Sequence, residues 1–99
     1  MGYTIKLFYI GLESPELAIK RVHQRVKKGG HGIDDLTVRR RYSVSMNALK
    51  NIIPLCDVAE LFDNSIELTS VAKYKNGEWL EFDYDCKWLV EALPDIKIE

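Results

Sequence analysis

The spacing of apolar and polar residues divides the chain into short blocks, and the first block predicts a strand. Residues 4–10 are β-branched, aromatic or aliphatic, with one lysine among them. A nearly continuous apolar run of this length is typical of a strand that is buried on both faces of a parallel sheet. We therefore expect the chain to begin with a buried strand over residues 4–10.

The next block predicts an amphipathic helix. Ser14 is a suitable N-cap, Pro15 fits the first helical position, and Gly29-Gly30 ends the helix. The apolar stripe of this helix is Ala18, Val22 and Val26, with Ile19 beside it.

A second, longer helix is predicted after a loop. Asp34 or Asp35 caps it, and Pro54 stops it near residue 53. Its stripe at helical spacing is Val38, Tyr42, Met46, Leu49 and Ile53.

The second half of the chain predicts three strands and a short helix. Asn76-Gly77 between two strand-like runs indicates a β-hairpin with a two-residue turn. The turn predicts the cross-strand pairs Lys75–Glu78, Tyr74–Trp79 and Val71–Phe82. The predicted segments are a strand over 57–62, a turn over 63–65, strands over 68–74 and 78–82, and a helix over 85–93.

These elements predict a single α/β domain over residues 1–99, in the order β-α-α-β-β-β-α. The sheet should have about four strands, with the first two parallel because a helical crossover joins them. The sheet ends in the C-terminal hairpin, followed by the short helix. At least one sheet edge needs a cover, and few elements remain to supply it.

Charge is segregated along the chain. Residues 20–41 hold eight Lys or Arg against two Asp, whereas residues 57–99 hold eleven acidic residues against four Lys. The basic residues flank a Gly-Gly break, so they can converge from two helices. This pattern favours an anionic ligand for the first half. No Gly-Lys-Ser/Thr phosphate loop occurs in the sequence.

The candidate phosphate contacts are arginines. Arg21 and Arg25 lie one turn apart on the first helix. In the run Arg39-Arg40-Arg41, helical geometry lets at most two side chains aim at one ligand. Guanidinium suits phosphate because its planar donors match the oxygens in pairs. The alternative is that these arginines are solvated, or pair with carboxylates.

Two further features allow a ligand-binding and a structural interpretation. His31 beside glycines is either a phosphate donor or an ordinary loop residue. The triplet 63–65 at a strand end either lines a ligand cleft or only forms a turn. Tyr74 and Trp79 fit a packing pair better than a stacking platform for bases.

Composition narrows the class of protein. The chain is 46% apolar and 29% charged, with a net charge of −1, which fits a globular domain. No apolar run has the length of a membrane span, and no secretory leader is recognisable. Two isolated cysteines and two histidines make a metal site untenable and predict reduced thiols in a cytoplasmic protein.

The serial order of several motifs resembles the C-terminal half of the zeta-toxin-like P-loop kinases. The matching stretches are YIGLESPELAI at 9–19, RV at 25–26, GGH at 29–31, RRRY at 39–42 and LFDNS at 61–65. The hairpin around Asn76-Gly77 and the pair Trp88-Leu89 extend the resemblance over nearly the whole chain. The sequence departs from the family pattern at Val44 and Ala48, where the family has Arg and Asn.

The resemblance implies an ATP-dependent phosphotransferase family whose lid-side arginines contact ATP phosphates. It makes Arg25, Arg39 and Arg40 the best phosphate contacts, with Arg21 as a further one. The family's phosphate-binding loop and general base lie upstream of the part that this chain matches. We therefore expect a module that is not catalytic alone, requires no cofactor and at most binds nucleotide phosphates weakly.

Partners follow from the same interpretation. We expect a homodimer, or pairing with a separate P-loop-containing chain, and no membrane partner. A nucleic-acid or regulatory protein-binding module is the alternative; few cations and an acidic second half count against nucleic acid. An enzyme with an unrecognised site is a third reading, but no cluster of His, Cys or carboxylates supports it.

Overall fold

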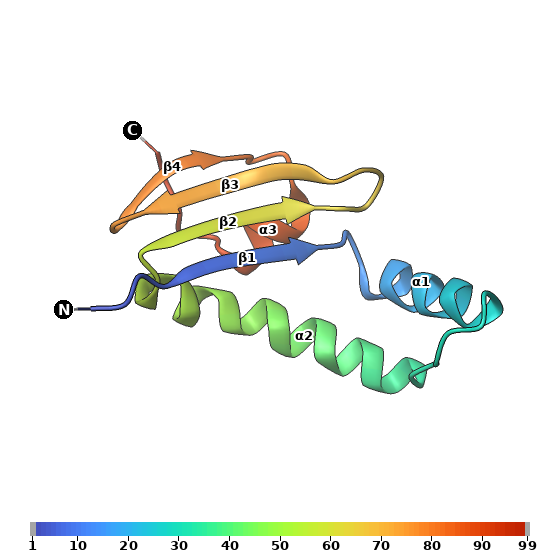
Figure 1. Ribbon diagram of the computed structural model, residues 1–99. Coiled ribbons are helices and arrows are strands. Elements are labelled where there is room, and N and C mark those ends of the chain that lie inside the picture. Colours follow the sequence, from blue (N-terminus) through green and yellow to red (C-terminus); the bar gives the residue numbers. More distant parts are fainter. Residues whose placement is uncertain (1, 99) are drawn as a thin grey trace.

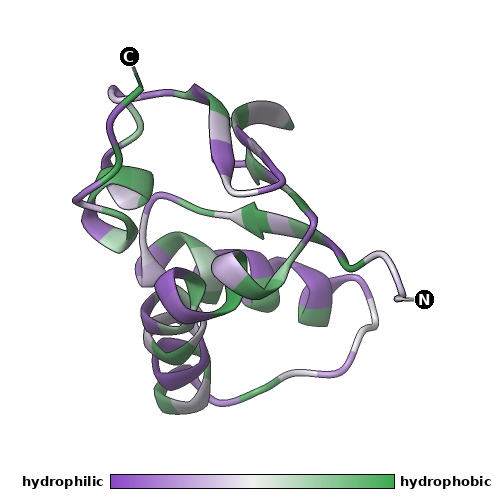
Figure 2. Ribbon diagram, turned by 90° about the vertical axis from the view of Figure 1, so that its left-hand side faces the viewer, coloured by the Kyte–Doolittle hydropathy of each residue, from purple (hydrophilic) through white to green (hydrophobic). Residues whose placement is uncertain are grey.

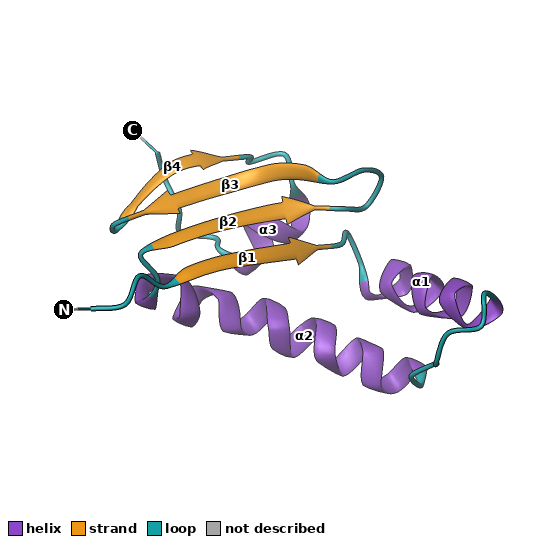
Figure 3. Ribbon diagram, in the orientation of Figure 1, coloured by secondary structure: helices purple, strands orange, loops and turns teal. Residues whose placement is uncertain are grey.

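The computed structural model describes residues 2–98, which form a four-stranded mixed sheet with three α-helices (Figures 1 and 3). The elements are β1 (Lys6–Gly11), α1 (Pro15–Lys27), α2 (Asp35–Ile52), a 3₁₀ turn η1 (Ile53–Leu55), β2 (Val58–Asp63), β3 (Thr69–Lys75), β4 (Glu78–Phe82) and α3 (Lys87–Ala92). The predicted α/β class and the predicted order of strands and helices are confirmed.

The strands follow one another across the sheet in the order β1-β2-β3-β4. β1 and β2 are parallel, as the helical crossover predicts, and the other two pairings are antiparallel. β1 and β4 are therefore the two edges of the sheet. Figure 1 shows α1 beyond the carboxyl ends of β1 and β2.

The hairpin between β3 and β4 confirms two predicted pairs, Lys75–Glu78 and Tyr74–Trp79. The rings of the second pair meet edge to face with centroids 5.2 Å apart, so they are a packing pair. The third predicted pair is wrong: Phe82 lies opposite Ala72, not Val71. A register shift between Lys73 and Tyr74 causes the difference, because the extra residue moves every later pair by one position.

The prediction that the first strand is buried on both faces is wrong. Leu7 and Tyr9 pack toward the core, but Lys6, Phe8 and Ile10 are exposed. β1 is an edge strand, and among residues 2–98 no helix covers the face that carries these three side chains. The apolar run therefore reflects an uncovered face rather than a central strand.

The main core lies between the sheet and two helices. Leu49 of α2 and Leu89 of α3 pack with Ala59 and Leu61 of β2, and each is almost fully inaccessible. Burying a leucine side chain stabilises the fold by about 1.5–3 kcal/mol. Figure 2 shows hydrophilic and hydrophobic residues alternating along the helices, as one-sided packing requires.

A second, smaller cluster joins α1 to α2. It consists of Ile19, Val22 and Val38 and is separate from the main core. Val26, which was predicted to belong to the stripe of the first helix, is 44% exposed. It lies in the last turns of α1, where the loop residue Gly32 is its close neighbour. α1 is thus attached to the molecule over a limited area.

Candidate functional site

A cavity of about 670 Å³ lies between α1, α2 and the carboxyl ends of the two parallel strands. Its sheet side is formed by residues 9–12 together with Asn64, which follows β2. Ligands commonly bind at the carboxyl ends of parallel strands, and the volume is typical of small-molecule sites.

The charged side chains that line the cavity are all cationic. Arg21, Arg25 and Lys28 come from α1 and its C-cap, and Arg41 comes from α2. None of the described residues that line the cavity is acidic. Within residues 2–98 these four cations form no ion pair, although Arg21 donates to the Ser65 carbonyl at 2.8 Å. The cavity therefore presents uncompensated positive charge to a ligand.

The end of α1 fixes the position of Arg25 and Lys28. Gly29 has φ of 95°, and its N–H donates to the Val26 carbonyl at 3.0 Å. The Gly30 N–H donates to the Arg25 carbonyl at 2.9 Å. These two bonds form a Schellman motif, which ends a helix sharply at a left-handed glycine. The Gly-Gly break thus turns the chain back toward α2 and holds the last turn of α1 in place.

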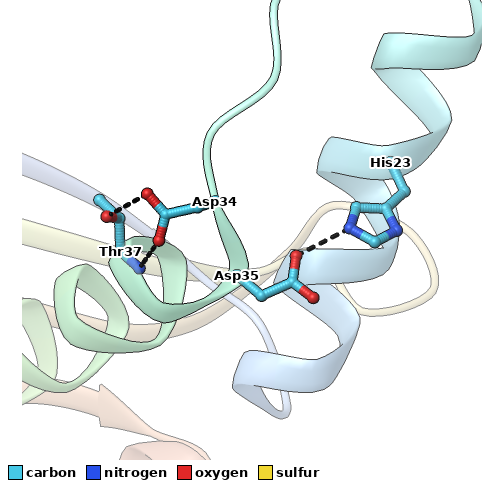
Figure 4. Close-up of polar contacts among 4 residues, drawn as sticks. All are labelled: His23, Asp34, Asp35 and Thr37. Atoms are coloured by element: carbon cyan, nitrogen blue, oxygen red, sulfur yellow. Dashed lines mark hydrogen bonds and ion pairs between the residues drawn. The ribbon is translucent and has the colours of Figure 1, made fainter.

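The start of α2 is tied to itself and to α1 (Figure 4). Asp34, not Asp35, is the N-cap: its carboxylate accepts from the Thr37 N–H at 2.9 Å and from the Thr37 hydroxyl at 2.8 Å. The hydroxyl bond is the main reason that the pKa of Asp34 is lowered. Asp35 instead contacts His23 of α1 at 2.8 Å, which joins the two helices.

Two hydrogen bonds from hydroxyl groups connect α2 to β1 and to the residue that follows it. Tyr42 donates to the Leu12 carbonyl and Ser45 donates to the Tyr9 hydroxyl, both at 2.8 Å. Burial raises the pKa of Tyr42 to about 12, because the phenolate loses water contact there. The Tyr42 phenol therefore stays neutral at physiological pH, and the charge of the cavity comes from its basic side chains.

The turn after β2 connects three elements around the same cavity. Asp63 accepts from the Trp88 indole at 2.9 Å and from the Ser65 hydroxyl at 2.7 Å. The Asn64 N–H donates to the Gly11 carbonyl at 2.9 Å, and Asn64 lines the cavity. The two interpretations of residues 63–65 thus apply to different side chains: Asp63 makes turn contacts, and Asn64 faces the cavity.

The structure brings two of the predicted phosphate contacts, Arg21 and Arg25, into this cavity and leaves the other three outside its lining. Arg39 donates to Glu16 of α1, and this hydrogen bond is the main cause of the lowered pKa of Glu16. Arg40 and His31 are exposed. Phosphate contact by Arg39, Arg40 or His31 stays a prediction.

The sequence left open which side chains of the run Arg39-Arg40-Arg41 contact a ligand and favoured the first two over Arg41, and it did not propose Lys28 as a phosphate contact. Helical spacing places Arg39 and Arg41 on opposite flanks of the apolar stripe of α2, but it does not show which flank faces α1. That choice depends on the side to which the chain folds back after Gly29-Gly30. For Lys28, the signal was its place just before the glycines, where it also complements the C-terminal helix dipole.

Within residues 2–98, no three His, Cys, Asp or Glu side chains lie close enough to hold a metal ion. In the same range, no helix is both long and apolar enough to cross a membrane. Both cysteines are free thiols, and burial raises the pKa of Cys86.

Searches against protein-family models, curated proteins and solved structures found no match to this chain.

Proposed function

We propose that this chain binds the phosphate groups of a nucleotide in the cavity between α1 and α2, without phosphoryl-transfer activity of its own. Uncompensated cations from two helices around one cavity are the observation that carries the proposal. Arginine supplies paired donors to phosphate oxygens, and Lys28 adds a point charge.

The remaining lining fits the other parts of a nucleotide. Apolar side chains of β1, both helices and the intervening loop, represented by Ile10, Val22 and Ile33, form much of the wall. An apolar wall with a few converging polar groups is typical of sites for small organic ligands. A nucleotide combines a flat aromatic base, whose ring faces can pack on apolar side chains, with an anionic phosphate group, which matches this division.

The proposal agrees with the resemblance to the C-terminal half of zeta-toxin-like kinases, in which arginines contact ATP phosphates. Phosphoryl transfer also needs a phosphate cradle, a metal and a positioned nucleophile. The sequence contains no Gly-Lys-Ser/Thr loop to supply the cradle. Binding without catalysis is therefore the activity that we assign.

Titration calorimetry with ATP tests the proposal. We expect weak binding, with Kd on the order of 1 mM, that weakens further as salt is added. Arg25→Ala and Arg41→Ala should each weaken binding by about tenfold, since a charge-assisted bond contributes about 1.5–3 kcal/mol. Lys20→Ala is the matched control: it removes an exposed cation of α1 that lies outside the cavity lining.

Three results would contradict the proposal. Absence of ATP binding at low salt would leave the cavity cations without a nucleotide role. Loss of binding in Arg39→Ala and Arg40→Ala but not in Arg25→Ala would move the site away from this cavity. Tighter binding to a single-stranded oligonucleotide than to ATP would favour the nucleic-acid alternative instead.

A further inference from the structure

The free edge of β1 exposes unpaired backbone groups. The Val58 N–H donates to the Ile5 carbonyl and the Asn64 N–H donates to the Gly11 carbonyl, one at each end of the parallel pairing. Successive residues of a strand direct their backbone N–H and C=O groups to opposite sides. Because the bonded carbonyls belong to residues 5 and 11, the odd-numbered residues of β1 form the hydrogen bonds with β2. The N–H and C=O groups of Lys6, Phe8 and Ile10 therefore point away from the sheet.

β1 lacks the devices that usually protect an edge strand. It carries one charged residue, Lys6 at its start, and it has no proline and no register shift against β2. Phe8 and Ile10 are 64% and 57% exposed. The opposite edge, β4, is shorter, carries Glu78 and Glu81, and lies beside a register shift. Charges, short length and bulges hinder edge pairing, so β1 is the edge open to a partner.

We propose that β1 pairs in antiparallel register with β1 of a second copy of this chain, forming one sheet through both copies. Two-fold symmetry makes the edge self-complementary: the outward N–H and C=O groups of one copy meet those of the other. The uncovered faces of the two copies lie on the same side of the joined sheet only if even-numbered residues of one β1 lie opposite even-numbered residues of the other. Phe8 then faces either Phe8 or Ile10 of the second copy, so apolar meets apolar.

The second copy also adds a residue to the cavity, a step that rests on the proposed function. Ile10 and Leu12 line the cavity, and they are even-numbered like Lys6, so the partner's Lys6 can lie opposite either of them. In the two registers that pair Phe8 with Phe8 or with Ile10, the partner's Lys6 lies opposite Ile10 or Leu12. The partner's Lys6 thereby brings a further cation to the rim of a site that already favours anions. Dimerisation and anion binding should consequently strengthen each other.

Sedimentation velocity over a concentration series, without ligand, tests the pairing. We expect a reversible dimer whose dissociation constant rises at least about tenfold in Phe8→Lys, because a charged side chain then replaces the apolar one that faces Phe8 or Ile10 of the second copy. The matched control is Leu80→Lys, since Leu80 is 54% exposed on the other edge strand. A monomer at every concentration, or equal weakening by both substitutions, would overturn the proposal.

Amide hydrogen exchange tests the same edge without any substitution. The amides of Phe8 and Ile10 should become protected as protein concentration rises. The amides of Leu7 and Tyr9, which donate hydrogen bonds to β2, should be protected at all concentrations. Rapid exchange at Phe8 and Ile10 at concentrations where a dimer forms would place the interface elsewhere and refute the pairing.

The contribution of Lys6 is tested by ATP titration of Lys6→Gln in the wild-type and Phe8→Lys backgrounds. We expect several-fold weaker binding in the dimer and no effect in the monomeric variant. An equal effect in both backgrounds, or none in either, would exclude Lys6 from a shared site. If the dimer forms but ATP does not bind, the proposed function fails while the pairing of β1 stands.

Discussion

Gly11 lies at the carboxyl end of β1 directly against the indole of Trp88. A Cβ at this position would come within 2.5 Å of that ring. The Trp88 side chain cannot easily move away, because it is almost fully buried and its indole N–H donates to Asp63. We expect Gly11→Ala to destabilise the protein by about 1–3 kcal/mol, the usual range for overpacking. Urea unfolding measures this change. Gly2→Ala is the control because a Cβ there meets nothing within 4 Å, and an equal loss in both variants would contradict the prediction.

The raised pKa of Tyr42 makes the free energy of unfolding depend on pH in the alkaline range. Its folded pKa is raised to about 12 from the ordinary value of 10, chiefly by burial. The folded state thus retains the phenolic proton at a pH where the unfolded state loses it, so stability is complete below pH 10 and falls toward pH 12. Absorbance of tyrosinate should show one late-titrating tyrosine that is absent in Tyr42→Phe. If the late titration persists in that variant, it belongs to another tyrosine.

At the scale of elements, Asp34 decides where α2 begins. We expect Asp34→Ala to lower the free energy of unfolding, as loss of an N-cap does in other helices, and Asp34→Asn to retain most of the stability. The folded pKa of Asp34 is lowered, so its contribution is present above the ordinary value of 3.8 and is lost as pH falls through the folded pKa. Urea unfolding at neutral and acidic pH measures both effects; an Asn variant as unstable as the Ala variant would exclude the cap.

Local signals predicted the elements well because the decisive contacts are local. The Ser14 cap, the Gly29-Gly30 ending and the Asn76-Gly77 turn depend on residues within a few positions of one another. The errors arose where these local signals do not determine the outcome. The exposure of Phe8 depends on which face the helices cover, and the Phe82 pairing depends on a register shift between Lys73 and Tyr74 that the two turn residues do not set. An apolar run alone cannot distinguish a central strand from an uncovered edge.

At the scale of the molecule, charge segregation predicted that basic side chains of the two helices converge, but it identified only part of those that line the cavity. Arg21 and Arg25 line the cavity together with Arg41, whereas Arg39 contacts Glu16. The direction in which the second helix folds back determines this choice, and it is set by tertiary contacts such as those between Tyr42 and Leu12. Sequence periodicity therefore predicts which side chains share a face, but not which face meets the neighbouring helix.

The limited attachment of α1 predicts that the molecule opens in two stages. Ile19, Val22 and Val38 form a cluster of their own, whereas β2 and β3 lie in the main core. Amides of α1 should therefore exchange through a partial opening of lower free energy than that of β2 and β3. Because Arg21, Arg25 and Lys28 belong to this segment, bound ATP should slow exchange in α1 first.

Native-state hydrogen exchange in low denaturant tests this order. Val22→Ala should lower the opening free energy of α1 by about 1–2 kcal/mol and leave β2 and β3 less affected. Val71→Ala is the control in the main core. Removing these two methyl groups should lower the global free energy of unfolding and so weaken protection of the slowest-exchanging amides of β2 and β3. One common opening free energy for α1, β2 and β3 would mean that the two clusters unfold together. In that case nucleotide binding would stabilise the whole molecule uniformly instead of ordering the helix that carries most of the cavity cations.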